Sequence, residues 1–144
     1  MKSLTLLSTL LVAATLALAA EKKPTPGPKG GKLLENSAPR AEFLIEKDNR
    51  VTITFYDDKL KPVPVGTQVI AITAEPASGK VKLELEKKGD VLTSKEPLPK
   101  GDGYNLVVQV KANAEAKPQN FRLKYDLHLC GMCKLKEYAC TCDH

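Results

Sequence analysis

The carboxyl end of this 144-residue chain gathers soft ligands. Its last residues, HLCGMCKLKEYACTCDH (128–144), contain all four cysteines and both histidines of the protein. Thiolates and imidazoles are the side chains that bind zinc, and sulfur ligands also suit Cu(I). The composition therefore predicts thiol or metal chemistry at this end of the chain and at no other place.

The first half of the cluster is a Cys-x-x-Cys motif. Cys130 and Cys133 enclose Gly131, and we expect this glycine to let the backbone turn so that both sulfurs point inward. If the preceding strand stays regular, His128 and Cys130 share one face of it, about 7 Å apart. This half supplies two thiols and one imidazole.

The second half places its ligands two positions apart, which puts them on one face of an extended backbone. The intervening KLKEY segment can return the chain toward the Cys-x-x-Cys motif. Four converging thiolates match tetrahedral zinc, and thiolate with imidazole also suits Cu(I). The predicted metal ligands are Cys130, Cys133, Cys140, Cys142, His128 and His144. Either histidine could replace a cysteine or serve as an outer ligand.

Two other uses of the cysteines stay open. An even number of cysteines in an exported protein commonly forms disulfides, and pairing Cys130–Cys142 with Cys133–Cys140 would staple a terminal hairpin. The protein would then be a non-catalytic structural or interaction module. The third reading is thiol–disulfide exchange through the Cys-x-x-Cys motif, whose thiols are activated by nearby positive charge. The two histidines favour metal, because disulfides need no imidazole.

The amino-terminal residues predict export. Lys2 provides a positive start, Leu4–Leu16 is apolar, and the small residues Ala17 and Ala19 predict cleavage after residue 19. The apolar run is shorter than the about 20 residues that a membrane span requires. We therefore expect residues 1–19 to be a signal peptide and the mature protein to be periplasmic or secreted, without a membrane anchor.

Residues 20–32, AEKKPTPGPKGGK, are rich in proline, glycine and lysine, and we expect a flexible basic leader there. The formal net charge of the chain is +5, and its lysines are interleaved with glutamates. A nucleic-acid site would cluster basic and aromatic side chains, so none is expected. The expected partners are a metal ion and another exported protein.

Between the leader and the tail, apolar and polar residues alternate with period two. This pattern is typical of half-buried strands. The predicted strands are 41–47, 50–56, 66–74, 80–86, 90–94, 103–112 and 120–129. Turn residues separate them. About seven such strands predict an all-β, antiparallel, immunoglobulin-like sandwich over residues 33–129, with a small barrel as the alternative. Residues 130–144 form the Cys/His-rich tail.

Within these strands the alternation also predicts which side chains face the core. It groups Val69, Ala71 and Thr73 on one side of their strand, and it continues without a break from Phe121 to Leu129 in the last one. Carboxylates occur mainly at turns and on solvent-facing positions. No catalytic triad or phosphate-binding loop is present, and we expect no enzymatic activity.

Residues 30–66 resemble the opening of small exported bacterial β-sandwich proteins, some of which accompany heavy-metal efflux systems. The residues that carry the resemblance are Gly30-Gly31, Leu34-Glu35, Ala41-Glu42, Arg50-Val51, Asp57 and Lys61-Pro62-Val63. The resemblance implies a sandwich fold. Members often carry a histidine just before the Ala-Glu pair, where this chain has Pro39-Arg40, so one potential ligand is missing. The cysteine tail is not part of the pattern.

Overall fold

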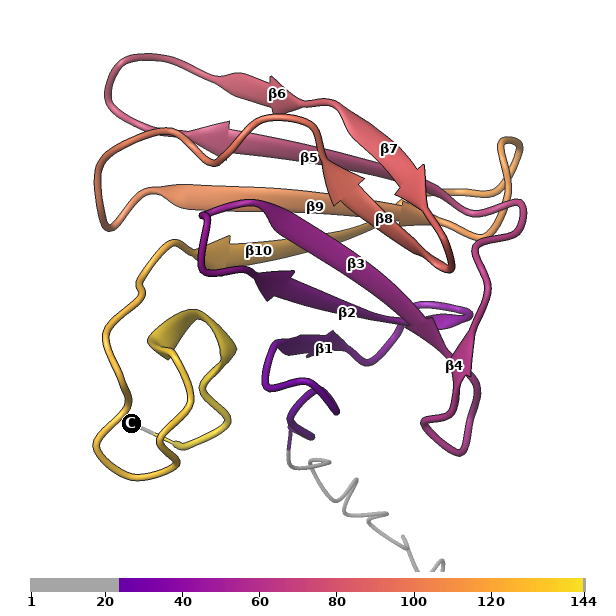
Figure 1. The fold of residues 1–144 in the computed structure, drawn as a ribbon, viewed down its shortest axis with the longest axis horizontal. Helices are drawn as coiled ribbons and strands as arrows, with labels where there is room; N and C mark the ends of the chain where they lie inside the picture. The colour runs from indigo at the N-terminus through magenta and orange to yellow at the C-terminus, as the bar shows by residue number, and fades with distance from the viewer. Residues whose placement is uncertain (1–23, 144) are drawn as a thin grey trace, which may run out of the picture.

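A computed structural model describes residues 24–143 and contains two antiparallel sheets packed face to face (Figure 1). The first sheet has the order β1-β2-β3-β8-β7, with β4 paired to β3, and the second has the order β10-β9-β5-β6. The strands of the first sheet are β1 (Lys32–Leu34), β2 (Arg40–Ile45), β3 (Val51–Tyr56), β4 (Pro62–Val63), β7 (Leu85–Lys88) and β8 (Val91–Ser94). Those of the second are β5 (Val69–Glu75), β6 (Val81–Leu83), β9 (Asn105–Lys111) and β10 (Gln119–Lys124). The predicted all-β antiparallel sandwich is confirmed.

The core lies between the two sheets and is mainly aliphatic. Phe43 of β2 and Ile53 of β3 meet Ile72 of β5 and Val108 of β9, and all four are fully buried. A buried side chain of this kind stabilises the fold by roughly 1.5–3 kcal/mol. The alternation in β9 is as predicted, since its core-facing residues are all buried. The sandwich thus has an apolar core of its own.

The facing of β5 is the reverse of the prediction. Ile72 and Ala74 are buried, whereas Val69 is 41% exposed. The reason is the pairing with β9, in which Ile72 lies opposite Val108. Directly opposed residues in an antiparallel pair lie on the same face of the sheet. The residues of β5 that face the core are therefore those opposite the buried residues of β9.

The single strand predicted at 80–86 is two strands in different sheets. β6 pairs with β5, and β7 pairs with β8. Glu84 connects them, and on either side of it Leu83 and Leu85 pack against the core from the two sheets. The period-two pattern is the same whether or not the chain changes sheets, so the sequence could not distinguish the two cases.

The segment predicted as a flexible leader is bound to the sandwich over its described part. The amides of Lys29 and Gly31 donate to Oε1 of Glu42 at 2.9 and 2.8 Å, and the Tyr56 hydroxyl donates to Oε2 at 2.6 Å. Glu42 is fully buried by this cover. A Cβ at residue 31 would lie 2.5 Å from the Phe43 carbonyl oxygen, so the close approach requires glycine. This arrangement differs from the prediction of a flexible leader up to residue 32, because residues 29 and 31 are bound to Glu42.

The last strand is shorter than predicted. β10 pairs with β9 from Gln119 to Lys124, and Lys124 lies opposite Asn105, the first residue of β9. Tyr125 still exchanges backbone hydrogen bonds with Tyr104 and Gly103, at 2.7 and 2.9 Å, but the strand ends there and Leu129 is exposed, so the prediction of a strand to residue 129 is wrong. Residues 126–143 leave the sheet and fold back beside β1 (Figure 1). This segment starts four residues before the predicted Cys/His-rich tail and is called the tail from here on. Within residues 24–143 no helix has the length and apolarity needed to cross a membrane.

Candidate metal centre

The tail is a small hairpin followed by one turn of 3₁₀ helix. Leu129 and Lys136 form a bridge, the amide of Cys130 donates to the Leu135 carbonyl at 2.8 Å, and the amide of Glu137 donates to the His128 carbonyl at 2.9 Å. The helical turn η1 (Glu137–Ala139) then directs the chain back toward the hairpin. This path brings the Cys-x-x-Cys segment next to the last residues of the chain.

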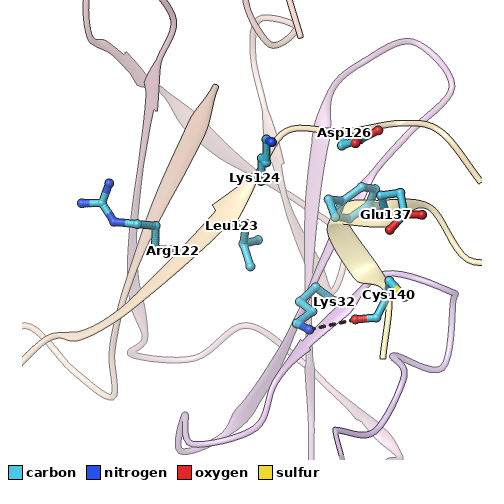
Figure 2. A pocket seen from close by; sticks show the side chains of 8 residues that line it. Lys32, Arg122, Leu123, Lys124, Asp126, Glu137 and Cys140 are labelled. Atoms are coloured by element: carbon cyan, nitrogen blue, oxygen red, sulfur yellow. Dashed lines mark hydrogen bonds between the residues drawn. The ribbon is translucent and has the colours of Figure 1, made fainter. Parts of the chain in front are cut away.

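Tyr138 anchors the tail to the sandwich. Its ring packs edge-on against Phe43, with ring centroids 6.1 Å apart, and its hydroxyl oxygen accepts a hydrogen bond of 3.0 Å from the Ile45 amide. Ala139 is fully buried beside it. Lys32 adds a hydrogen bond from Nζ to the Cys140 carbonyl (Figure 2). The sequence analysis missed this anchor, because a lone tyrosine in KLKEYA carries no periodic signal.

The turn between the two hairpin limbs uses Lys134 rather than glycine. Lys134 has a φ of 61°, and its amide donates to the Cys130 carbonyl at 3.1 Å. The predicted turn does include Gly131, but Gly131 is not among the residues with positive φ, so the turn does not require a glycine at that position. The left-handed residue falls after the second cysteine of the motif. A non-glycine residue pays roughly 1–2 kcal/mol for that conformation.

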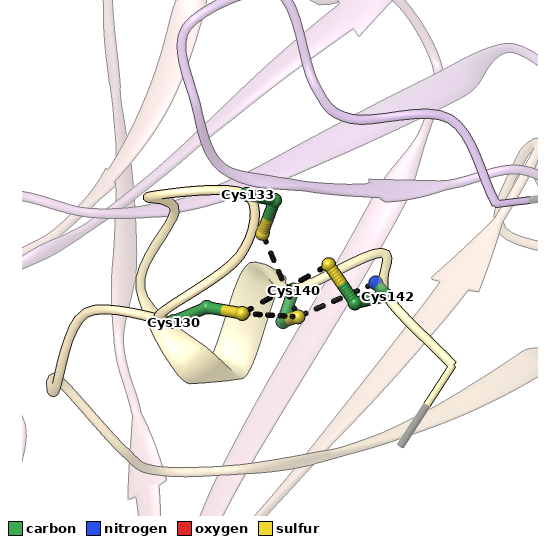
Figure 3. Close-up of side chains that lie close together, drawn as sticks. All are labelled: Cys130, Cys133, Cys140 and Cys142. Atoms are coloured by element: carbon green, nitrogen blue, oxygen red, sulfur yellow. Dashed lines mark hydrogen bonds between the residues drawn. The ribbon is translucent and has the colours of Figure 1, made fainter.

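The four sulfur atoms converge on one point (Figure 3). The Sγ–Sγ distances are 3.3 Å for Cys130–Cys140, 3.6 Å for Cys133–Cys140 and 3.9 Å for Cys130–Cys142. All four ligand atoms lie within 4.8 Å of one another. A tetrahedral zinc with bonds of about 2.3 Å requires sulfurs about 3.8 Å apart, whereas a disulfide requires about 2.05 Å. None of the four cysteines is in a disulfide, and the spacing of their sulfurs fits a tetrahedral ion.

Backbone amides point at the sulfurs of the Cys-x-x-Cys motif. Hydrogen bonds from the amides of Cys133 and Met132 lower the pKa of the Cys130 thiol. The Leu135 amide is the largest influence on Cys133 and lowers its pKa to about 6. Such bonds favour the thiolate, which is the form that binds metals. The turn therefore favours the thiolate form of Cys130 and Cys133, which is the form that binds a cation.

The other two thiols are shifted in the opposite direction. Burial among neighbouring sulfurs raises the pKa of Cys142 to about 12. For Cys140, the Cys142 amide donates to Sγ at 3.3 Å and favours the thiolate, but desolvation and the neighbouring thiols outweigh it and raise the pKa. Four thiolates cannot crowd together without a positive charge between them. The arrangement thus gains most from a cation at its centre.

Of the two predicted histidine ligands, His128 is described, and it does not join the sulfurs. His128 Nδ1 lies 2.8 Å from Asp126 Oδ1, and the His128 side chain is 78% exposed. This carboxylate raises the pKa of His128. The prediction that His128 and Cys130 share a strand face assumed a regular strand, and β10 ends before either residue. His144 lies outside the described residues.

A cavity lined by charged side chains lies between the sandwich and the tail, beside Cys140. It has a volume of about 370 Å³, and its lining includes Lys32 of β1, Arg122 and Lys124 of β10, and the carboxylates of Asp126 and Glu137 (Figure 2). Of these side chains Lys32 contacts Cys140, through the carbonyl oxygen. The cavity thus carries charges of both signs next to the sulfur cluster.

Comparison with known proteins adds no relative. No protein-family model, no curated protein and no solved structure matches the chain. Within residues 24–143 the four cysteines form the one group of at least three Cys, His, Asp or Glu side chains close enough to hold an ion. The functional interpretation therefore comes from the chemistry of this group.

Proposed function

We propose that the protein is an exported β-sandwich that binds one soft metal ion, Zn²⁺ or Cu(I), through its tail and serves in metal buffering, sensing or delivery. The observation that carries the proposal is the convergence of four cysteine sulfurs, none of them in a disulfide, within 4.8 Å of one another. The apolar core of the sandwich does not include the thiols, which supports a fold in which the sandwich is a scaffold and the tail is the binding site.

Zinc is the first candidate for the ion. A tetrahedral set of four sulfurs is typical of zinc or iron sites, and zinc is the ion that needs no redox partner. Cu(I) is the second candidate, because thiolates are soft ligands. The two make different demands: zinc uses all four sulfurs, whereas Cu(I) is satisfied with fewer. Ligand-by-ligand replacement can therefore separate them.

A set of four protein ligands also supports a non-catalytic role. Catalytic zinc sites keep one position open for water or substrate, and closed sites are structural or storage sites. Export is supported by the amino-terminal sequence, which has the pattern of a signal peptide and lies outside the described residues. The resemblance of residues 30–66 to exported sandwich proteins points in the same direction.

A second candidate function is a disulfide-stapled interaction module. The sulfurs of Cys130 and Cys142, and those of Cys133 and Cys140, are neighbours in the cluster and could pair. This alternative needs no ion. It predicts a chain with no free thiols that is indifferent to chelators.

Native mass spectrometry and thiol counting on protein isolated from the exporting compartment distinguish the two. We expect one ion per chain and four alkylatable thiols after the metal is chelated. Cys130→Ser should lose the ion, whereas Met132→Leu, a change in the same turn without a thiol, should keep it. A metal-free chain with no reactive thiol would refute the proposal.

A further inference from the structure

The four cysteines of the sulfur cluster differ in how accessible they are to solvent. Cys130 is fully buried, whereas Cys133, Cys140 and Cys142 are each partly exposed. The Sγ atoms of Cys133 and Cys140 lie 3.6 Å apart. The remaining pair, Cys130 and Cys142, lies 3.9 Å apart. Both members of the Cys133–Cys140 pair are therefore accessible to a reagent, whereas in the Cys130–Cys142 pair only Cys142 is accessible.

We propose that the cluster is a dithiol switch as well as a metal site: a partner disulfide oxidises Cys133 with Cys140 first and Cys130 with Cys142 second, and the first step releases the ion. This inference rests on the proposed metal function and names its regulation. The partner is defined by its chemistry, which is a reducible disulfide in an exported dithiol protein or in a small molecule such as oxidised glutathione.

The first step is an ordinary thiol–disulfide exchange. The Cys133 sulfur attacks one sulfur of the partner disulfide, whose S–S bond breaks, and one partner thiolate leaves. The Cys140 sulfur then attacks the Cys133 sulfur, the mixed disulfide breaks, and the second partner thiolate leaves. Two electrons pass to the partner, whose disulfide takes up two protons from solvent and becomes two thiols. The zinc ion departs as Zn²⁺ with no change in oxidation state.

Metal binding and oxidation exclude each other. A pair of sulfurs bonded at about 2.05 Å cannot act as two thiolate ligands, and two thiolates alone do not complete a tetrahedral zinc site. Bringing the Cys133 and Cys140 sulfurs into bonding distance from 3.6 Å needs only a small side-chain movement. The same sulfurs are therefore placed for either state, and the ion protects them against oxidation.

The order of the two pairs follows from access and proximity. Cys133 is partly exposed and has the Cys140 sulfur 3.6 Å away to resolve a mixed disulfide, whereas the fully buried Cys130 cannot itself meet an external disulfide. Pairing Cys140 with Cys142 would close a ring across a single residue and would be strained. The tail keeps its place through Tyr138, whose contacts to Phe43 and Ile45 involve no sulfur.

The test uses the full chain loaded with one equivalent of zinc and treated with oxidised glutathione. A chromogenic chelator follows zinc release, samples are quenched with an alkylating reagent, and peptide mapping locates each disulfide. We expect complete zinc release as the first disulfide forms, with Cys133–Cys140 linked in that species and Cys130–Cys142 linked afterwards. Excess free zinc should favour re-formation of the loaded site and so lower the yield of the first disulfide. A dithiol reductant with zinc should restore the loaded form.

Variants and outcomes keep the two proposals distinguishable. Met132→Leu should follow the wild-type time course, whereas Cys140→Ser should lose the fast first disulfide. Zinc retained at a large excess of oxidised glutathione, or a first disulfide that includes Cys130, would overturn the switch and leave the metal site standing. Disulfides formed by a chain that never binds zinc would overturn both proposals.

Discussion

The sandwich and the tail are stabilised by different physics. The sandwich buries a continuous apolar core, with Phe43, Ile53 and Val108 at its centre, and all four cysteines lie outside its strands. The tail packs Tyr138 and Ala139 against that core and otherwise turns around its sulfurs. A region with a core folds on its own, whereas a short region without one needs a ligand or cross-link. We therefore expect that loss of metal binding leaves the sandwich folded.

Replacing a ligand gives the largest expected effect. Cys130→Ser should weaken zinc binding by more than about 100-fold, because even groups that only support the ligands are worth about 10–100-fold. The sandwich should keep its thermal midpoint within about 4 °C, the shift expected for less than about 1 kcal/mol. A zinc titration against a competing chelator and a circular-dichroism melt measure the two.

The control for this comparison is a sandwich residue. Ile53→Ala removes side-chain volume from the core, which should cost about 2–5 kcal/mol of folding free energy. The remaining folded fraction should bind zinc with wild-type affinity. If Cys130→Ser unfolded the sandwich as Ile53→Ala does, the two regions would be one cooperative unit and the separation would be wrong.

The anchor between the regions is the next test. Tyr138→Ala removes a buried ring and should cost about 3–5 kcal/mol, as for other buried aromatic truncations. Tyr138→Phe keeps the ring against Phe43 and removes only the acceptor of the Ile45 amide, which should cost about 1–3 kcal/mol. Hydrogen exchange at the Ile45 amide should rise in both. Unchanged exchange would mean that the tail does not dock through this residue.

Part of this architecture could be predicted from local pattern. Alternation identified most of the strands and the buried face of β9, and the clustering of thiols in the sequence identified the four cysteines that converge. Sheet membership could not be predicted: the break at Glu84 and the reversed facing of β5 both depend on which strand lies alongside. Period-two patterns specify two faces, and tertiary pairing decides which of them is inside.

The site shows the same limit. The sequence analysis found the four cysteines, but included His128, which pairs with Asp126 instead. It also assigned the turn to Gly131, whereas Lys134 adopts the left-handed conformation. The inclusion of His128 came from extending a regular strand past residue 124, where the ladder with β9 ends. Ligand types were readable from composition, and their geometry was not.

The pH dependence of metal binding separates the two halves of the cluster. Above pH 6 Cys133 is already a thiolate, because its pKa is about 6, and it releases no proton when zinc binds. Cys140 and Cys142, whose pKa values are raised, must each lose one. These two thiols alone should raise zinc affinity about 100-fold per pH unit near neutrality. Calorimetry in two buffers of different ionisation enthalpy counts the protons, and four released protons would contradict this assignment.

The smallest effect concerns the backbone of the turn. Lys134→Gly relieves a left-handed conformation and should stabilise the folded tail by about 1 kcal/mol, which is about a fivefold gain in zinc affinity. Gly131→Ala is the matched control: no atom lies within 4 Å of a Cβ placed there and its φ is not positive, so zinc affinity should hardly change. If Gly131→Ala weakened binding and Lys134→Gly did not strengthen it, the glycine would be turning the chain after all. The metal-bound tail would then have a different backbone from the one described here.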